Sequence, residues 1–156
     1  RLVMQSSALF SECRTYRYNL WRIWDESLDS ILFIGLNPSK ADESYNDPTI
    51  NRCINFAKKW GYGGLCMANL FAYRATQPRI MMLADDPIGP ENDQILFDLV
   101  SKAKIVVAAW GNHGSFMGRS AHIARSIDNL KCLAVNKSGE PAHPLYLSES
   151  TKLITY

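Results

Sequence analysis

One asparagine of this chain, Asn37, directly precedes a proline that restricts its backbone. Asn37 belongs to the segment 35–39 (GLNPS), where Pro38 biases the asparagine toward an extended conformation. A rigidly held amide can orient a water molecule or bind the edge of a base, although it is too weak a base to remove a proton by itself. The alternative is a structural Asn-Pro turn. The spacing alone leaves both interpretations open.

His143 is a second candidate, because the segment 141–144 (PAHP) confines it between two prolines. This confinement favours a functional role over a structural one. A neutral histidine can donate a hydrogen bond to a developing oxyanion, and a protonated one can stabilise negative charge directly. His143 is therefore a candidate for stabilising an anionic group.

Asn69 closes an apolar run, which is an uncommon place for a polar side chain unless its hydrogen bonds are satisfied. Its amide offers donors and an acceptor, which match a nucleobase edge; alternatively, it ties down the next loop. In that loop, Arg74 can hold a phosphate or form a salt bridge to Asp85 or Asp86. Both pairs of alternatives stay open at this point.

No cofactor or metal site is expected. The chain carries no phosphate-binding loop, GxSxG, HExxH or dinucleotide-binding motif. Its cysteines lack CxxC spacing and its histidines lack ligand spacing, which predicts reduced thiols packed as small hydrophobic side chains. These residues are Cys13, Cys53, Cys66, Cys132, His113, His122 and His143.

Four apolar runs predict the strands that position the candidate side chains: 31–34, 65–70, 105–110 and 131–135. Their continuous hydrophobicity is typical of strands that are buried on both faces. A helix is predicted from Asp47 as N-cap and Pro48 as first helical residue to a stop at Gly61. Further helices are predicted from near residue 90 to 100 and over roughly 116–127, and one or two extra antiparallel strands over 13–24.

Strands that alternate with helices predict a mostly parallel sheet covered on both sides. In such sheets, ligands bind beyond the carboxyl ends of the strands. The GLNPS segment follows the first predicted strand, Asn69 closes the second, a WGNHG segment follows the third, and an HPLY segment follows the fourth. We therefore expect a polar site at this edge of the sheet.

Length and composition predict a single domain, 1–156, in the cytoplasm. No apolar run is long enough to span a bilayer, and the first residues lack the pattern of a signal peptide. The net charge of +2 permits nucleic-acid binding without arguing for it. Arg14, Arg17 and Arg22 alternate with aromatic residues, which favours a half-exposed β-hairpin over a basic binding patch.

The string GLNPS…NDPTINR…NLFAYRAT…GPEND…VVAAWG…HPLYL resembles a family of short bacterial and phage proteins known only as a domain of unknown function. The resemblance covers residues 13–147. The order of motifs is also distantly similar to the uracil-DNA glycosylase superfamily. That similarity implies an α/β three-layer sandwich with a central, mostly parallel four-stranded sheet, plus an N-terminal antiparallel hairpin.

The superfamily similarity implies roles for individual residues. Asn37 would position the attacking water, Asn69 would read the base and Tyr45 would stack beneath it. His143 would stabilise the departing base, while Leu145 or Tyr146 would wedge into the base stack. The remaining residues of the implied DNA-binding surface are Ser39, Arg74 and Pro144.

The implied function is a DNA glycosylase that uses water to hydrolyse the N-glycosidic bond of a flipped, possibly modified pyrimidine. The implied partner is DNA, with no cofactor, metal or membrane. The alternative is a nucleotide- or nucleoside-binding protein on the same fold without glycosylase activity. The modest charge favours this alternative, since proteins that bind duplex DNA usually present a more basic face.

Overall fold

Two parallel strands with almost wholly buried side chains form the centre of the molecule. The computed structural model describes residues 4–156. Strand β3 (Ser30–Gly35) pairs with β4 (Gly64–Asn69) in parallel register, from Ser30 opposite Gly64 to Gly35 opposite Asn69. Helices cover both faces of this pair, so neither face can carry unpaired polar groups. This is why both runs are continuously apolar.

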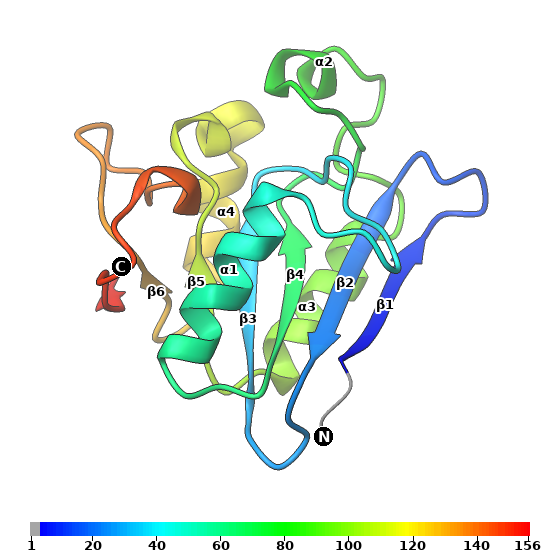
Figure 1. Cartoon of the computed structure of the whole chain (residues 1–156). Helices are drawn as coiled ribbons and strands as arrows, with labels where there is room; N and C mark the ends of the chain where they lie inside the picture. The colour runs from blue at the N-terminus through cyan, green and yellow to red at the C-terminus, as the bar shows by residue number, and fades with distance from the viewer. Residues whose placement is uncertain (1–3) are drawn as a thin grey trace.

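The sheet has seven strands in the order β1-β2-β4-β3-β5-β6-β7 (Figure 1). The four predicted parallel strands are present, and β5 and β6 extend the sheet on the far side of β3. The expected count of four was wrong, because an antiparallel hairpin and a short last strand join the same sheet. The other strands are β1 (Gln5–Phe10), β2 (Arg17–Ile23), β5 (Val106–Ala108), β6 (Lys131–Cys132) and β7 (Ile154–Thr155).

The N-terminal hairpin is longer than the segment 13–24 indicated. Its first strand, β1, precedes that segment and exposes most of its side chains, so it gives no apolar pattern. Residues 11–16 form the turn, and β2 pairs on its other side with β4. The prediction of extra antiparallel strands is confirmed, with this correction to their position.

Helix α1 (Pro48–Lys59) begins as predicted, since the Asp47 carboxylate accepts a hydrogen bond from the Ile50 amide at 3.0 Å. Helix α3 (Asn92–Lys102) starts slightly later than expected. Three helical segments were not predicted, the short α2 and the 3₁₀ segments η1 and η2. The bounds of these segments and of the last helix are α2 (Pro78–Met82), η1 (Asn112–Gly118), α4 (Arg119–Arg125) and η2 (Pro144–Tyr146).

The predicted helix over 116–127 is shorter in the structure, because Met117 and Gly118 adopt positive φ angles of 55° and 67°. Left-handed backbone ends the 3₁₀ segment η1 and forces α4 to start afresh at Arg119. The apolar spacing of residues 116–127 did not reveal this break.

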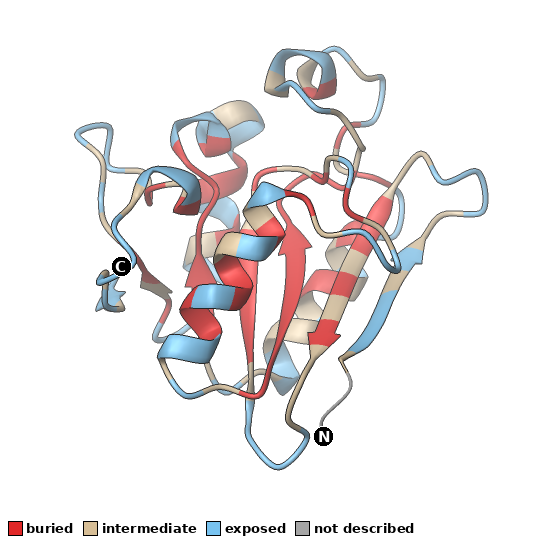
Figure 2. Cartoon of the chain, viewed as in Figure 1, coloured by how far each residue is buried: buried red, intermediate tan, exposed pale blue. Residues whose placement is uncertain are grey.

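Alternate residues of the central strands supply two hydrophobic cores, one on each face of the sheet. Ile31 and Phe33 pack with residues of α1, whereas Leu32 and Ile34 pack with residues of α3 and α4. Figure 2 shows the buried residues concentrated in the central strands. The predicted α/β class is therefore confirmed. Across the residues described, every helix is too short or too polar to cross a membrane.

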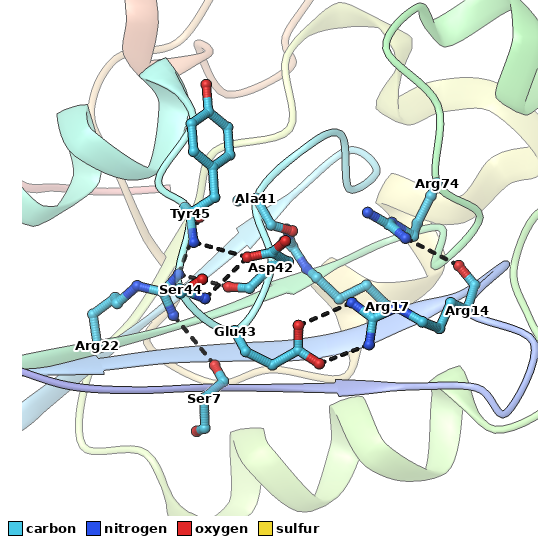
Figure 3. Close-up of polar contacts among 10 residues, drawn as sticks. All are labelled: Ser7, Arg14, Arg17, Arg22, Ala41, Asp42, Glu43, Ser44, Tyr45 and Arg74. Carbon is cyan, nitrogen blue, oxygen red and sulfur yellow. Dashed lines mark hydrogen bonds and ion pairs between the residues drawn. The ribbon is translucent and has the colours of Figure 1, made fainter.

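Arg22 ties the hairpin to the loop that follows β3 (Figure 3). Its buried guanidinium donates to the carbonyl oxygens of Asp42 at 2.6 Å and Tyr45 at 3.1 Å, and to Asn46 Oδ1 at 2.7 Å. It also donates to the carbonyls of Ser7 and Trp21. The hairpin was predicted correctly, but Arg22 and Arg17 are buried rather than half-exposed.

Arg14 contacts the same loop from a solvent-exposed position, through two hydrogen bonds to the Glu43 carboxylate at 2.7 and 2.9 Å. The two arginines therefore form a natural comparison of a buried and an exposed contact between the hairpin and one loop. Solvent screens the exposed pair and competes for its hydrogen bonds.

We expect Arg22→Met to lower the free energy of unfolding by at least about 3 kcal/mol, because it leaves several buried acceptors without a donor. Arg14→Met is the matched control on the same hairpin and should cause a much smaller loss. Urea unfolding followed by circular dichroism measures both. Equal losses for the two variants would contradict the role given to Arg22.

Candidate functional site

A cleft of about 1040 Å³ opens at the carboxyl ends of the parallel strands. The chain leaves β3 toward β4 on one side and later returns to β5 on the other side of β3. The strand order therefore reverses between β3 and β5, and open α/β sheets bind ligands at such a switch point. The cleft is walled by the segments that follow β3, β4, β5 and β6.

The cleft brings together all but one of the residues that the sequence nominated. Asn37 and Ser39 come from the loop after β3, Tyr45 from further along that loop, and Asn69 from the end of β4. The opposite wall carries the HPLY segment. The nominated residues that line the cleft there are His143, Pro144, Leu145 and Tyr146.

Arg74 is the exception, since it is not among the residues that line the cleft. Its guanidinium lies 4.7 Å from the centre of the Phe10 ring and donates to the Arg14 carbonyl at 3.2 Å. Among the described residues it forms no salt bridge to Asp85 or Asp86. Arg74 therefore packs against the turn of the hairpin.

Asn37 makes a structural contact through one end of its amide and, among the residues described, leaves the other end unpaired. Its Nδ2 atom donates to the carbonyl oxygens of Ala75 at 2.9 Å and Pro38 at 3.1 Å, which ties two loops together. Because carbonyls only accept, these bonds fix which end of the amide is nitrogen. Within residues 4–156, Asn37 Oδ1 has no hydrogen-bond partner, so the amide retains a free acceptor at a position that lines the cleft.

The amide of Asn69 is used the other way round, with its oxygen bonded and its nitrogen unpaired over residues 4–156. Its Oδ1 atom accepts a hydrogen bond from Arg17 Nη2 at 3.3 Å, and no partner for Nδ2 occurs in the described part of the chain. Gly35 lies beside it across the β3–β4 pair, where a Cβ atom would come within 2.9 Å of Nδ2. The glycine that precedes Asn37 therefore leaves the space that the Asn69 amide occupies.

Arg17 lines the cleft and was not identified as a site residue from the sequence. It is 2% exposed and donates to the Ala41 carbonyl at 3.2 Å as well as to Asn69. Burial lowers its pKa to about 10, against an opposing effect of Asp47, so the group stays charged at neutral pH. The alternation of arginines with aromatic residues gave no sign of this burial, and Arg17 pairs with Phe10, where the hairpin register shifts.

His143 is held in one tautomer. Its Nδ1 atom accepts a hydrogen bond from the Leu145 amide at 3.3 Å, so the proton of the neutral ring lies on Nε2. Burial lowers the pKa of His143 below 6.5, and Asp47 opposes this shift. Of the two forms considered for this histidine, the neutral donor is therefore the one present at pH 7.

Asp47 also lines the cleft, but backbone amides occupy both of its oxygens. Oδ1 accepts from Ile50, as described for the N-cap, and Oδ2 accepts from the Ala41 amide at 3.3 Å. The interpretation of Asp47 as a cap is confirmed. Within the residues described, no group of His, Cys, Asp and Glu side chains is arranged to hold a metal ion.

Two tyrosines stand at the rim of this polar cleft. Tyr45 is 51% exposed and Tyr146 is 87% exposed, on opposite walls of the cleft. Leu145 beside Tyr146 is also exposed. Exposed aromatic faces at a cleft entrance offer surfaces on which a planar ligand can stack.

We expect His143 to titrate with a midpoint below 6.5 in the folded chain. The unfolded chain then binds more protons just below pH 6.5, so this group makes stability fall as pH falls through that window. His143→Asn can still accept from the Leu145 amide but does not titrate, and should remove this part of the slope. NMR titration of the imidazole and urea unfolding between about pH 5 and 7.5 test both points. A midpoint at or above 6.5 would contradict the burial argument.

Comparison with known proteins gives one family. The model described as protein of unknown function (DUF1643) matches residues 17–145, a span that includes Asn37, Asn69 and His143. No curated protein and no solved structure matches the chain. The expected membership of a domain-of-unknown-function family is confirmed, and the similarity to uracil-DNA glycosylases stays a prediction. The chain belongs to the DUF1643 family of proteins of unknown function.

Proposed function

We propose that this chain is a DNA glycosylase that hydrolyses the N-glycosidic bond of a flipped pyrimidine. One observation carries the proposal: three side chains with fixed and complementary hydrogen-bonding groups line a single cleft. Asn37 retains a free acceptor, Asn69 a free donor and His143 a proton on Nε2. Such a combination can orient a water molecule, bind a base and stabilise an anionic leaving group.

Each group has a role in the proposed reaction. Asn69 Nδ2 donates to an oxygen of the base, and Asn37 Oδ1 accepts a hydrogen bond from a water molecule and orients it toward C1′ of the sugar. The C1′–N bond breaks and its electron pair leaves with the base. The water oxygen bonds to C1′ and its proton passes to solvent. The His143 Nε2–H group donates to the anionic base as charge develops.

This scheme relies on electrostatic stabilisation rather than on a strong nucleophile. A neutral His143 suits it, because its Nε2–H group can donate a hydrogen bond to the anionic base without transferring the proton. The lowered pKa of His143 keeps the ring in that form at neutral pH. The exposed rings of Tyr45 and Tyr146 add stacking surfaces for an extruded base.

The alternative is a nucleotide- or nucleoside-binding protein without glycosylase activity. The net charge of only +2 favours it, as does the position of Arg74 away from the cleft. A protein that neutralises several phosphates of a duplex loses affinity steeply with added salt. The alternative therefore predicts a binding constant that changes little with salt.

Incubation with oligonucleotides that carry uracil, hydroxymethylated or glycosylated pyrimidines, in single and double strands, should produce abasic sites with at least one of them. Alkaline cleavage of the strand detects these sites. Asn37→Ala should slow the reaction by about 100-fold or more, because it removes the group that orients the water. Asn55→Ala, on the exposed side of α1, is the matched control and should leave the rate unchanged.

If the native chain cleaves none of these substrates and is as inactive as Asn37→Ala, the proposal is overturned. Circular dichroism of Asn37→Ala establishes that the variant is folded, since its Nδ2 bonds to two loops are lost as well. Nucleoside binding without cleavage, with little dependence on salt, would instead support the alternative.

A further inference from the structure

Arg17 is a buried cation to which the proposed reaction gives no role. Its side chain lines the cleft and is 2% exposed, yet the described residues form no salt bridge with it. Its Nε atom is buried without a hydrogen-bond partner. Burying a charge costs stability, and the nearby charge of Asp47 offsets this only in part, since burial still lowers the Arg17 pKa. Its hydrogen-bond partners, the Ala41 carbonyl and Asn69, indicate what Arg17 positions.

The contact between Arg17 and Asn69 has a directional consequence. A guanidinium group only donates hydrogen bonds, so the atom of the Asn69 amide that faces Arg17 at 3.3 Å must be the oxygen. Rotating the amide by half a turn would place its NH₂ group against the guanidinium, donor against donor. Arg17 therefore determines that Asn69 offers donors elsewhere, through Nδ2.

The space around Nδ2 agrees with this arrangement. The missing side chain of Gly35 leaves room for the nitrogen, since a Cβ atom there would lie 2.9 Å from it. No partner within residues 4–156 uses this donor. The amide is thus held in one orientation, with its NH₂ group unused at the end of β4.

We propose that Arg17 is a specificity-determining residue, which fixes the Asn69 amide so that the cleft selects pyrimidines with a carbonyl oxygen at C4 over those with an amino group there. In pyrimidines this means uracil- or thymine-type bases, including those substituted at C5, over cytosine-type bases. The inference rests on the proposed function, because it assigns Asn69 to the edge of the base.

The selectivity follows from unpaired groups. A carbonyl oxygen accepts from Asn69 Nδ2, whereas an exocyclic amino group would face it donor to donor and leave both unpaired in a desolvated site. Without Arg17, the amide can turn and present its oxygen to an amino group. Arg17 is therefore a positioning residue, and its removal should change the choice of base more than the affinity for the preferred one.

Titration of the ¹⁵N-labelled full chain with 2′-deoxyuridine and 2′-deoxycytidine, followed by NMR, tests the proposal without requiring catalysis. The native chain should bind deoxyuridine at least about tenfold more tightly, the difference expected for one unpaired donor. Arg17→Met should reduce this ratio to about twofold or less. Arg17→Gln should do the same, because its amide can donate or accept; it also keeps a polar group for the Ala41 carbonyl.

Arg125→Met makes the same replacement at an exposed position of α4 and should keep the native ratio. The side-chain amide signals of Asn69 add a direct reading, since they should move with deoxyuridine in the native chain. Circular dichroism establishes which Arg17 variants are folded, and the folded one of the two is compared with the native chain.

The outcomes separate this inference from the proposed function. Equal affinities in the native chain, or native selectivity in a folded Arg17 variant, would overturn the role of Arg17. If abasic sites still form in the cleavage assay, the proposed function stands without it. If neither nucleoside moves any signal from the cleft and no substrate of the panel is cleaved, both the role of Arg17 and the proposed function are overturned.

Discussion

The burial of two arginines from one strand, β2, governs the shape of the site. A guanidinium removed from water must find acceptors, and Arg17 and Arg22 find most of theirs on the loop that follows β3. The loop supplies backbone carbonyls from Ala41, Asp42 and Tyr45 to these arginines, and the side chain of Asn46 adds a further acceptor. The same loop then delivers Asp47 to the start of α1 and Asn37 to the cleft.

The central part of the fold was predictable because its signals are local. Continuous apolar runs identified β3, β4, β5 and β6, and the Asp47-Pro48 pair identified the start of α1. Elements without such a signal were missed. Strand β1 is mostly exposed, β7 has two residues, and the left-handed residues that shorten the last helix interrupt no apolar pattern.

The residues of the candidate site also divide into those with a local sequence signal and those without one. Asn37, Asn69 and His143 were found because polar residues beyond successive parallel strands converge on one edge of the sheet. Arg17 was missed because its burial depends on partners far along the chain, Ala41 and Asn69, while its neighbours in sequence indicate a half-exposed strand. The orientation of each amide was equally inaccessible, since it is set by the donor or acceptor that each one meets across the cleft wall.

The unequal lengths of the paired strands give the two walls of the cleft different support. Asn37 and Asn69 follow β3 and β4, which pair over six positions, whereas the wall with His143 follows β5 and β6, which pair with each other at two positions. Fewer ladder hydrogen bonds mean a lower free energy of local opening. The asparagine wall is thus held by strand pairing, whereas the histidine wall is held by loop contacts such as the hydrogen bonds of Gly111 to Pro141 and of Ala142 to Ala134.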